Sequence, residues 1–146
     1  MKYLLKILFI MMLNQYALAD QIDASGLMCD LDEQESKRAP SKKLIYYFDN
    51  GTVYAIQVFK QSSPIKIGKI LISKYRYDDK EIKWEGQNAS KSIKYYAIVD
   101  KSSHVLNIKY VFVSGSKSKN NSEKFFYCKF TNWQTIEEFL KPQLEN

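Results

Sequence analysis

Residues 43–59, KLIYYFDNGTVYAIQVF, carry the pattern from which the fold of this chain is predicted. Two mainly apolar runs, 43–48 and 52–59, flank Asp49-Asn50-Gly51. Asn-Gly between two such runs is a strong hairpin signal, because both central residues of the tightest hairpin turn adopt positive φ. The segment therefore predicts two antiparallel strands joined by a short turn.

Short strand-like runs continue on both sides of this hairpin. On its N-terminal side, residues 27–31 alternate so that one face is apolar. On its C-terminal side, the run 65–77 is long for one strand, and Gly68 within it predicts a bulge or bend. Regularly spaced short strands with brief connections are typical of an all-β sandwich or barrel. The remaining predicted strands are 81–85, 93–99, 106–112 and 126–130.

The two cysteines favour the barrel over the sandwich. Cys29 belongs to the first predicted strand and Cys128 to the last, too far apart in sequence for a typical redox pair. A structural disulfide would hold their Cα atoms about 4.4–6.8 Å apart, so the terminal strands must meet. We therefore predict an all-β fold over residues 20–131, an antiparallel meander of about eight strands closed into a small barrel.

Residues 1–19 have the features of a cleavable signal peptide. Lys2 and Lys6 form a short positive region, an apolar run follows over 7–13, and Ala17-Leu18-Ala19 supplies the small residues that a signal peptidase requires. The apolar run is shorter than the roughly 20 residues that a membrane-spanning helix needs. We expect an exported protein, periplasmic or secreted, with no transmembrane segment in the mature chain.

The hydrophobic period changes from that of a strand to that of a helix near the C-terminus. Asn132 or Thr135 is expected to cap this helix, and Pro142 to end it. We predict that residues 132–146 form a short helix packed on the barrel as a lid; an amphipathic segment for a membrane or partner is the alternative. The apolar residues at helical spacing are Trp133, Ile136, Phe139 and Leu140.

Charge argues against a nucleic-acid partner. The chain carries a formal net charge of +6, with 22 basic and 16 acidic residues. The basic residues are mostly lysines scattered among acids, whereas nucleic-acid binders concentrate arginine and lysine on one face. The composition predicts a solvated surface of mixed charge, with weak attraction to an anionic envelope surface as an alternative.

No pattern of residues indicates catalysis, a metal or a cofactor. His104 is the only histidine, and it could act as a base only if a nucleophile and an acid converged on it. Asp100, Ser102 and Ser103 are near in sequence, but an exposed histidine in a turn is the favoured interpretation. One histidine and two cysteines are too few for zinc, and Asp30-x-Asp32 only weakly resembles a calcium loop. We expect no enzyme activity and no cofactor.

Aromatic residues are abundant, with 11 tyrosines, 8 phenylalanines and 2 tryptophans. Tyrosine is favoured at recognition surfaces because it combines a large area with a polar tip, and it is also a good strand former. Adjacent tyrosines in a strand point to opposite faces, so some should reach the surface. The predicted binding surface consists of Tyr47, Tyr75, Tyr77 and Tyr96.

Three segments resemble short exported bacterial proteins of unknown function with a single disulfide. They are Met28-Cys29-Asp30-Leu31, the hairpin around Asn50-Gly51, and Tyr127-Cys128-Lys129. The layout is also similar to that of periplasmic C-type lysozyme inhibitors, a resemblance that implies a small disulfide-linked β-barrel. The Ser-Gly-x-x-Tyr inhibitory loop of that family is absent, since Ser114-Gly115 is followed by Ser-Lys-Ser.

These patterns leave three hypotheses for function. The first is a non-enzymatic periplasmic or secreted module that binds a protein or envelope component through loops and exposed tyrosines. The second is a lipocalin-like carrier of a small apolar ligand, with a cavity open at one end and gated by the C-terminal helix. The third, which we favour least, is an enzyme built around His104.

Overall fold

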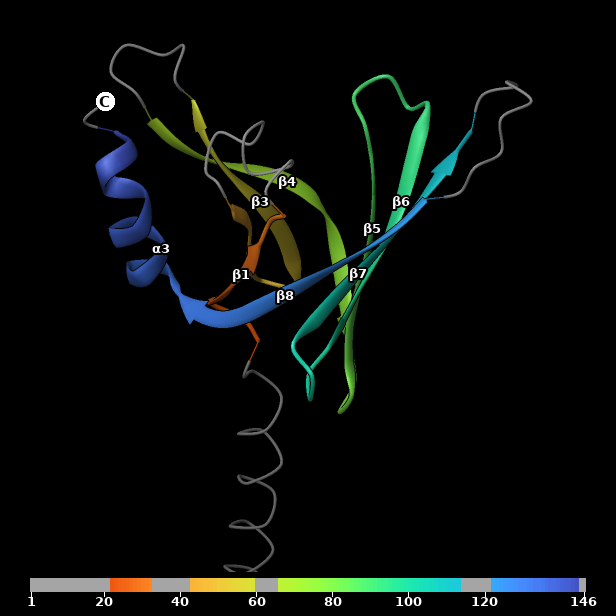
Figure 1. Cartoon of the computed structure of the whole chain (residues 1–146), viewed down its shortest axis with the longest axis horizontal. Coiled ribbons are helices and arrows are strands. Elements are labelled where there is room, and N and C mark those ends of the chain that lie inside the picture. Colours follow the sequence, from red (N-terminus) through yellow and green to blue (C-terminus); the bar gives the residue numbers. More distant parts are fainter. Residues whose placement is uncertain (1–21, 33–42, 60–65, 114–121, 145–146) are drawn as a thin grey trace, which may run out of the picture.

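The structure is a computed structural model that describes residues 22–32, 43–59, 66–113 and 122–144. Eight antiparallel strands follow one another around a closed barrel in sequence order, which confirms the predicted fold class (Figure 1). The predicted signal peptide, residues 1–19, lies outside the described residues. The elements are β1 (Ser25–Asp30), β2 (Lys43–Asp49), β3 (Thr52–Phe59), β4 (Lys66–Tyr77), β5 (Glu81–Gln87), β6 (Ile93–Asp100), β7 (Val105–Phe112), β8 (Ser122–Asn132), α3 (Trp133–Leu140) and the 3₁₀ turn η1 (Lys141–Gln143).

The β2–β3 hairpin forms as the sequence predicts. Asn50 and Gly51 both adopt positive φ, at 49° and 67°, the conformation that a two-residue hairpin turn requires. Asp49 pairs with Thr52 directly across this turn. The tight turns after β2, β4 and β6 lie at one end of the barrel, because consecutive strands are antiparallel. The longer connections are therefore at the other end.

A disulfide joins the first and last strands of the barrel. Cys29 pairs with Cys128 in the register of β1 with β8, their Cα atoms are 3.9 Å apart, and their sulfurs are bonded. Both side chains are buried in the barrel core. The predicted bridge and the closure that it implies are confirmed.

Edge-to-face aromatic contacts fill the interior near the end with the tight turns. The Phe48 ring lies 5.2 Å from Tyr75 and 5.7 Å from Trp84, and Tyr46 lies 4.9 Å from Trp84. Such pairs stabilise a core beyond the area that they bury. Trp84 Nε1 is buried without a hydrogen-bond acceptor in the described part of the chain. This end of the barrel is a packed core.

The predicted C-terminal helix forms as α3, and it packs on the outer face of β1, β2 and β3 (Figure 1). It begins at Trp133, where the capping side chain of Asn132 accepts a hydrogen bond from the Thr135 amide at 2.9 Å. The strands present apolar side chains outward here, and these require cover from water. The second core that results consists of Ile45, Tyr47, Ile56, Val58, Ile136 and Leu140.

The bulge in β4 lies at Ile72 and not at Gly68. Val53 pairs with Ser73 and Tyr54 pairs with Leu71, which leaves Ile72 as the extra residue, whereas Gly68 pairs regularly. A bulge bends its strand and increases the local twist. Beyond this point β4 departs from β5, and the two strands pair only through Tyr75–Tyr77 of β4. None of the helices within the described ranges is long and apolar enough to cross a membrane.

Candidate functional site

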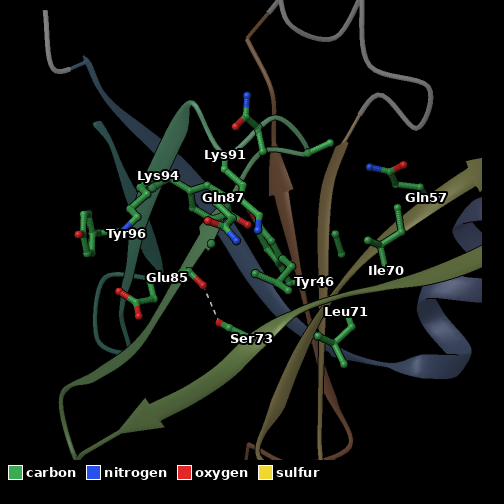
Figure 2. Close-up of a pocket in the computed structure, with 16 residues that line it drawn as sticks. Tyr46, Gln57, Ile70, Leu71, Ser73, Glu85, Gln87, Lys91, Lys94 and Tyr96 are labelled. Atoms are coloured by element: carbon green, nitrogen blue, oxygen red, sulfur yellow. Dashed lines mark hydrogen bonds between the residues drawn. The ribbon is translucent and has the colours of Figure 1, made fainter. Parts of the chain in front are cut away.

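A cleft opens where β4 and β5 separate. The last link between the two strands is the Ser73 hydroxyl, which donates a hydrogen bond to the Glu85 carbonyl oxygen at 2.6 Å (Figure 2). Beyond it, towards the end with the longer connections, the space between the strands has a volume of about 670 Å³. This volume lies within the range of about 300–1,000 Å³ that is usual for ligand sites.

One wall of the cleft is mainly apolar. It is built by β3 and β4, which contribute Ala55, Ile70, Leu71 and Ile72. Ile70 is 39% exposed and Leu71 is 65% exposed. Large aliphatic side chains at this exposure leave apolar area that a bound ligand would remove from water.

The opposite wall is polar and carries positive charge. It consists of the end of β5, the start of β6 and the turn between them, and its lining residues include Gln87, Lys91 and Lys94 (Figure 2). The turn is held by the Asn88 side chain, whose Nδ2 donates to Ser92 Oγ at 3.0 Å and whose Oδ1 accepts from the Ile93 amide at 3.0 Å. These bonds order the turn that positions the lysines.

Two tyrosines from β2 and β6 lie at the inner end of the cleft. Tyr46 is almost fully buried, and the Tyr95 ring lies directly over Gly86, where any Cβ would clash with it. Burial raises the pKa of Tyr95 to about 12, with a smaller contribution from the neighbouring Tyr110. Burial likewise raises the pKa of Tyr46 well above its usual value. The two hydroxyls are therefore uncharged at neutral pH and can act as hydrogen-bond donors or acceptors.

Two of the four predicted binding tyrosines are buried, so the predicted surface does not exist as such. Tyr47 is 8% exposed, lies beneath α3 with its ring 5.1 Å from Trp133, and has Lys69 Nζ 4.3 Å from its centroid. Tyr75 is 8% exposed and packs inside the barrel, with its hydroxyl donating to the Asp23 carboxylate. Tyr47 is buried because α3 covers the outer face of β2.

The other two predicted tyrosines are exposed but lie apart. Tyr77 is 43% exposed at the end with the tight turns, where Lys101 Nζ lies 5.3 Å from its ring centroid. Tyr96 is 44% exposed on β6 and is the one member of the predicted set that lines the cleft. The structure thus retains Tyr96 in the candidate site and separates it from the other three.

His104 is exposed in the β6–β7 turn, as expected. Its backbone amide donates to the Asp100 carbonyl, and its ring meets Phe130 edge-on at 5.6 Å. The Asp100 carboxylate accepts hydrogen bonds from the Ser102 hydroxyl and from the Ser102 and Ser103 amides, which lower its pKa to about 2. These groups build the turn. No three metal-ligating side chains gather anywhere in the described ranges.

A second exposed apolar surface lies on the outer face of β6, β7 and β8. Ile98, Asn107 and Phe125 stand in one cross-strand row, and Phe125 is 63% exposed. Tyr127, on the same face of β8, is 74% exposed. Unlike the outer face of β1–β3, no helix of the described chain covers this surface.

Most of the cleft residues were missed from the sequence because they come from five strands and one turn. The signal that could have indicated them is a mismatch in length, since β4 has 12 residues and its partner β5 has 7. A strand that extends beyond the end of its neighbour has backbone groups along that edge with no strand to pair with. No protein-family model, curated protein or solved structure matches this chain, so its function must be inferred from the cleft itself.

Proposed function

We propose that this protein is a non-enzymatic binding module, exported from the cytoplasm, whose ligand enters the cleft between β4 and β5. The observation that carries the proposal is the contrast within one barrel between an interior filled by aromatic rings and an opening of about 670 Å³ beside it. The disulfide between Cys29 and Cys128 supports an oxidising compartment outside the cytoplasm.

The chemistry of the cleft favours a ligand with both apolar and anionic character. Ile70 offers exposed aliphatic area on one wall, while Lys91 and Lys94 are among the residues that line the other. Among the described residues that line the cleft, Glu85 is the only acidic one. A protein or envelope component with an apolar, acidic segment would therefore complement both walls.

A small apolar ligand, carried in the manner of a lipocalin, is the second candidate. The volume of the cleft favours it, because drug-sized and lipid-sized molecules occupy sites of this size. In this case α3 would not act as a gate, since the helix covers the outer face of β1–β3 and contributes no residue to the cleft.

Two substitutions that fill the cleft test the proposal. Ala55→Phe and Gln57→Trp each introduce an aromatic ring on the β3 wall of the cleft. The matched control is Lys109→Trp, which introduces a ring on the exposed outer face of β7. Each oxidised protein would be incubated with envelope extract, and the retained proteins and lipids identified by mass spectrometry. We expect the same specific component on the wild type and the control, and its loss on both cleft variants.

Equal retention of that component by all folded variants would refute the cleft as the binding site. Thermal unfolding of each variant, with its disulfide intact, establishes that a lost ligand does not reflect a lost fold. A retained lipid in place of a protein would favour the carrier over the interaction module.

A further inference from the structure

The edge of β4 that faces the cleft has no strand partner in the described part of the chain. β4 pairs with β3 from Lys66 to Lys74, but with β5 only from Tyr75 to Tyr77. In an antiparallel sheet, alternate residues direct their amide and carbonyl groups to opposite neighbours. About half of the residues from Lys66 to Ile72 therefore present these groups to the cleft.

The edge of β5 ends its pairing at the same place. Glu85, Gly86 and Gln87 pair with β6, while the ladder with β4 stops at Trp84. The Ser73–Glu85 hydrogen bond uses one of the carbonyls on this edge, and the strands then diverge. The cleft is thus bordered by two strand edges of one barrel, which diverge next to the bulge at Ile72.

We propose that the cleft binds an extended, acidic peptide segment of a partner protein, which adds to β4 as a further strand. This inference rests on the proposed function and deepens it. Main-chain hydrogen bonds to β4 would provide affinity, and alternate side chains of the peptide would meet Ile70, Ile72 and Tyr46. The unpaired length from Lys66 to Ile72 corresponds to about 20 Å of extended chain.

Charge selects an acidic peptide over a second copy of this chain. Lys91 and Lys94 line the cleft, and among the described residues Glu85 is the only acidic side chain that lines it, so an acidic peptide on β4 would meet a wall of net positive charge. Two β4 edges paired with each other would instead bring their own lysines together, and like charges across strands are destabilising. Lysines on an edge strand protect it against self-association in this way.

The test uses a fluorescein-labelled heptapeptide of alternating glutamate and valine, with binding followed by fluorescence anisotropy on the full oxidised protein. We expect saturable binding and slower amide hydrogen exchange in residues 66–72. The same peptide with N-methylated valines keeps its side chains but loses main-chain donors, so it should bind at least about tenfold more weakly. A lysine–valine peptide should also bind more weakly, because its charge matches that of the cleft.

A charge reversal inside the cleft has a matched control outside it. Lys91→Glu combined with Lys94→Glu should weaken binding of the glutamate–valine peptide about fivefold to tenfold. Lys109→Glu combined with Lys129→Glu changes the net charge equally on the exposed outer faces of β7 and β8, and should leave affinity within about twofold.

The outcomes separate this inference from the function on which it rests. Equal binding of the N-methylated peptide, or unchanged exchange in residues 66–72, would overturn strand addition while leaving a cleft-dependent ligand in place. If the protein without peptide is a dimer, and the amides of residues 66–72 already exchange slowly, the β4 edge pairs with a second copy of the chain and the proposal is overturned. Failure of the peptide to bind, together with no cleft-dependent component in envelope extract, would overturn both proposals.

Discussion

The two junctions on opposite sides of the barrel, β1 with β8 and β4 with β5, are built differently. β1 and β8 pair through five residues, and a disulfide joins Cys29 to Cys128 within that ladder. β4 and β5 pair through three residues, followed by one side-chain hydrogen bond from Ser73. Both junctions close the same ring, so a covalent bond at one of them allows the other to open without loss of the barrel.

The first prediction removes the covalent bond, and we expect the largest effect from it. Replacing both cysteines, Cys29→Ala with Cys128→Ala, should lower the free energy of unfolding by about 3–5 kcal/mol, because a loop of 99 residues is no longer closed in the unfolded chain. Denaturant unfolding of wild type and variant measures this difference. Reduction of the wild type should lower its free energy of unfolding by the same amount and leave that of the double variant unchanged. A decrease below about 1 kcal/mol would show that strand pairing alone holds this junction.

The second prediction removes the cover over the closed junction. Ile136 is fully buried between α3 and the strands, so Ile136→Ala should destabilise the protein by about 2–4 kcal/mol through lost burial and a cavity. Glu137→Ala on the exposed face of α3 is the control and should change stability by less than about 0.5 kcal/mol. Equal unfolding midpoints in urea for the two variants would contradict a structural role for the helix.

The third prediction weakens the open junction. Ser73→Ala removes the hydrogen bond to the Glu85 carbonyl and should cost about 1 kcal/mol or less. The more specific effect is local, because amide hydrogen exchange should become faster around Tyr75–Tyr77 while β1 and β8 keep their protection. Ser122→Ala at the exposed start of β8 is the control. A uniform increase in exchange over the whole barrel would mean that the two junctions are not independent.

The fourth prediction concerns the free energy of unfolding at alkaline pH, where the effect is expected, and not at neutral pH. Burial raises the pKa of Tyr95 from 10.0 to about 12, so the folded protein keeps a proton that the unfolded chain releases. Stability from this group is therefore complete below pH 10 and is lost as the pH rises through about 12. Tyr95→Phe should reduce this alkaline loss, measured by urea unfolding at stepped pH, whereas Tyr127→Phe at an exposed position should not. Identical dependence of the free energy of unfolding on pH for wild type and Tyr95→Phe would contradict a contribution from Tyr95.

The residues that were predicted well are those whose signal is local. Asn50-Gly51 specifies a turn by its own backbone preference, and the turn forms with both residues at positive φ. Alternating apolar residues place Leu27 and Cys29 in the core whatever the neighbouring strand. Asn132 caps α3 through a contact three residues away. In each case the interaction that decides the structure lies within a few residues of chain.

The burial of Tyr47 and Tyr75 could not be predicted from signals within a few residues of chain. Each alternates correctly along its strand, but alternation assigns a side chain to a face and does not say what covers that face. Tyr47 is buried because α3 returns from the far end of the chain, and Tyr75 because Phe48 packs against it inside the barrel. The same alternation leaves Phe125 and Tyr127 exposed on strands that no described helix covers.

By itself, the sequence determined an eight-strand meander, its turns and the pair of cysteines that closes it, because strand period, turn preference and disulfide reach act over short or covalent distances. Only the tertiary structure decided that β4 bulges at Ile72, leaves β5 after Ser73 and opens a cleft. That outcome depends on the twist of strands paired across the whole barrel, which no single segment of the chain encodes.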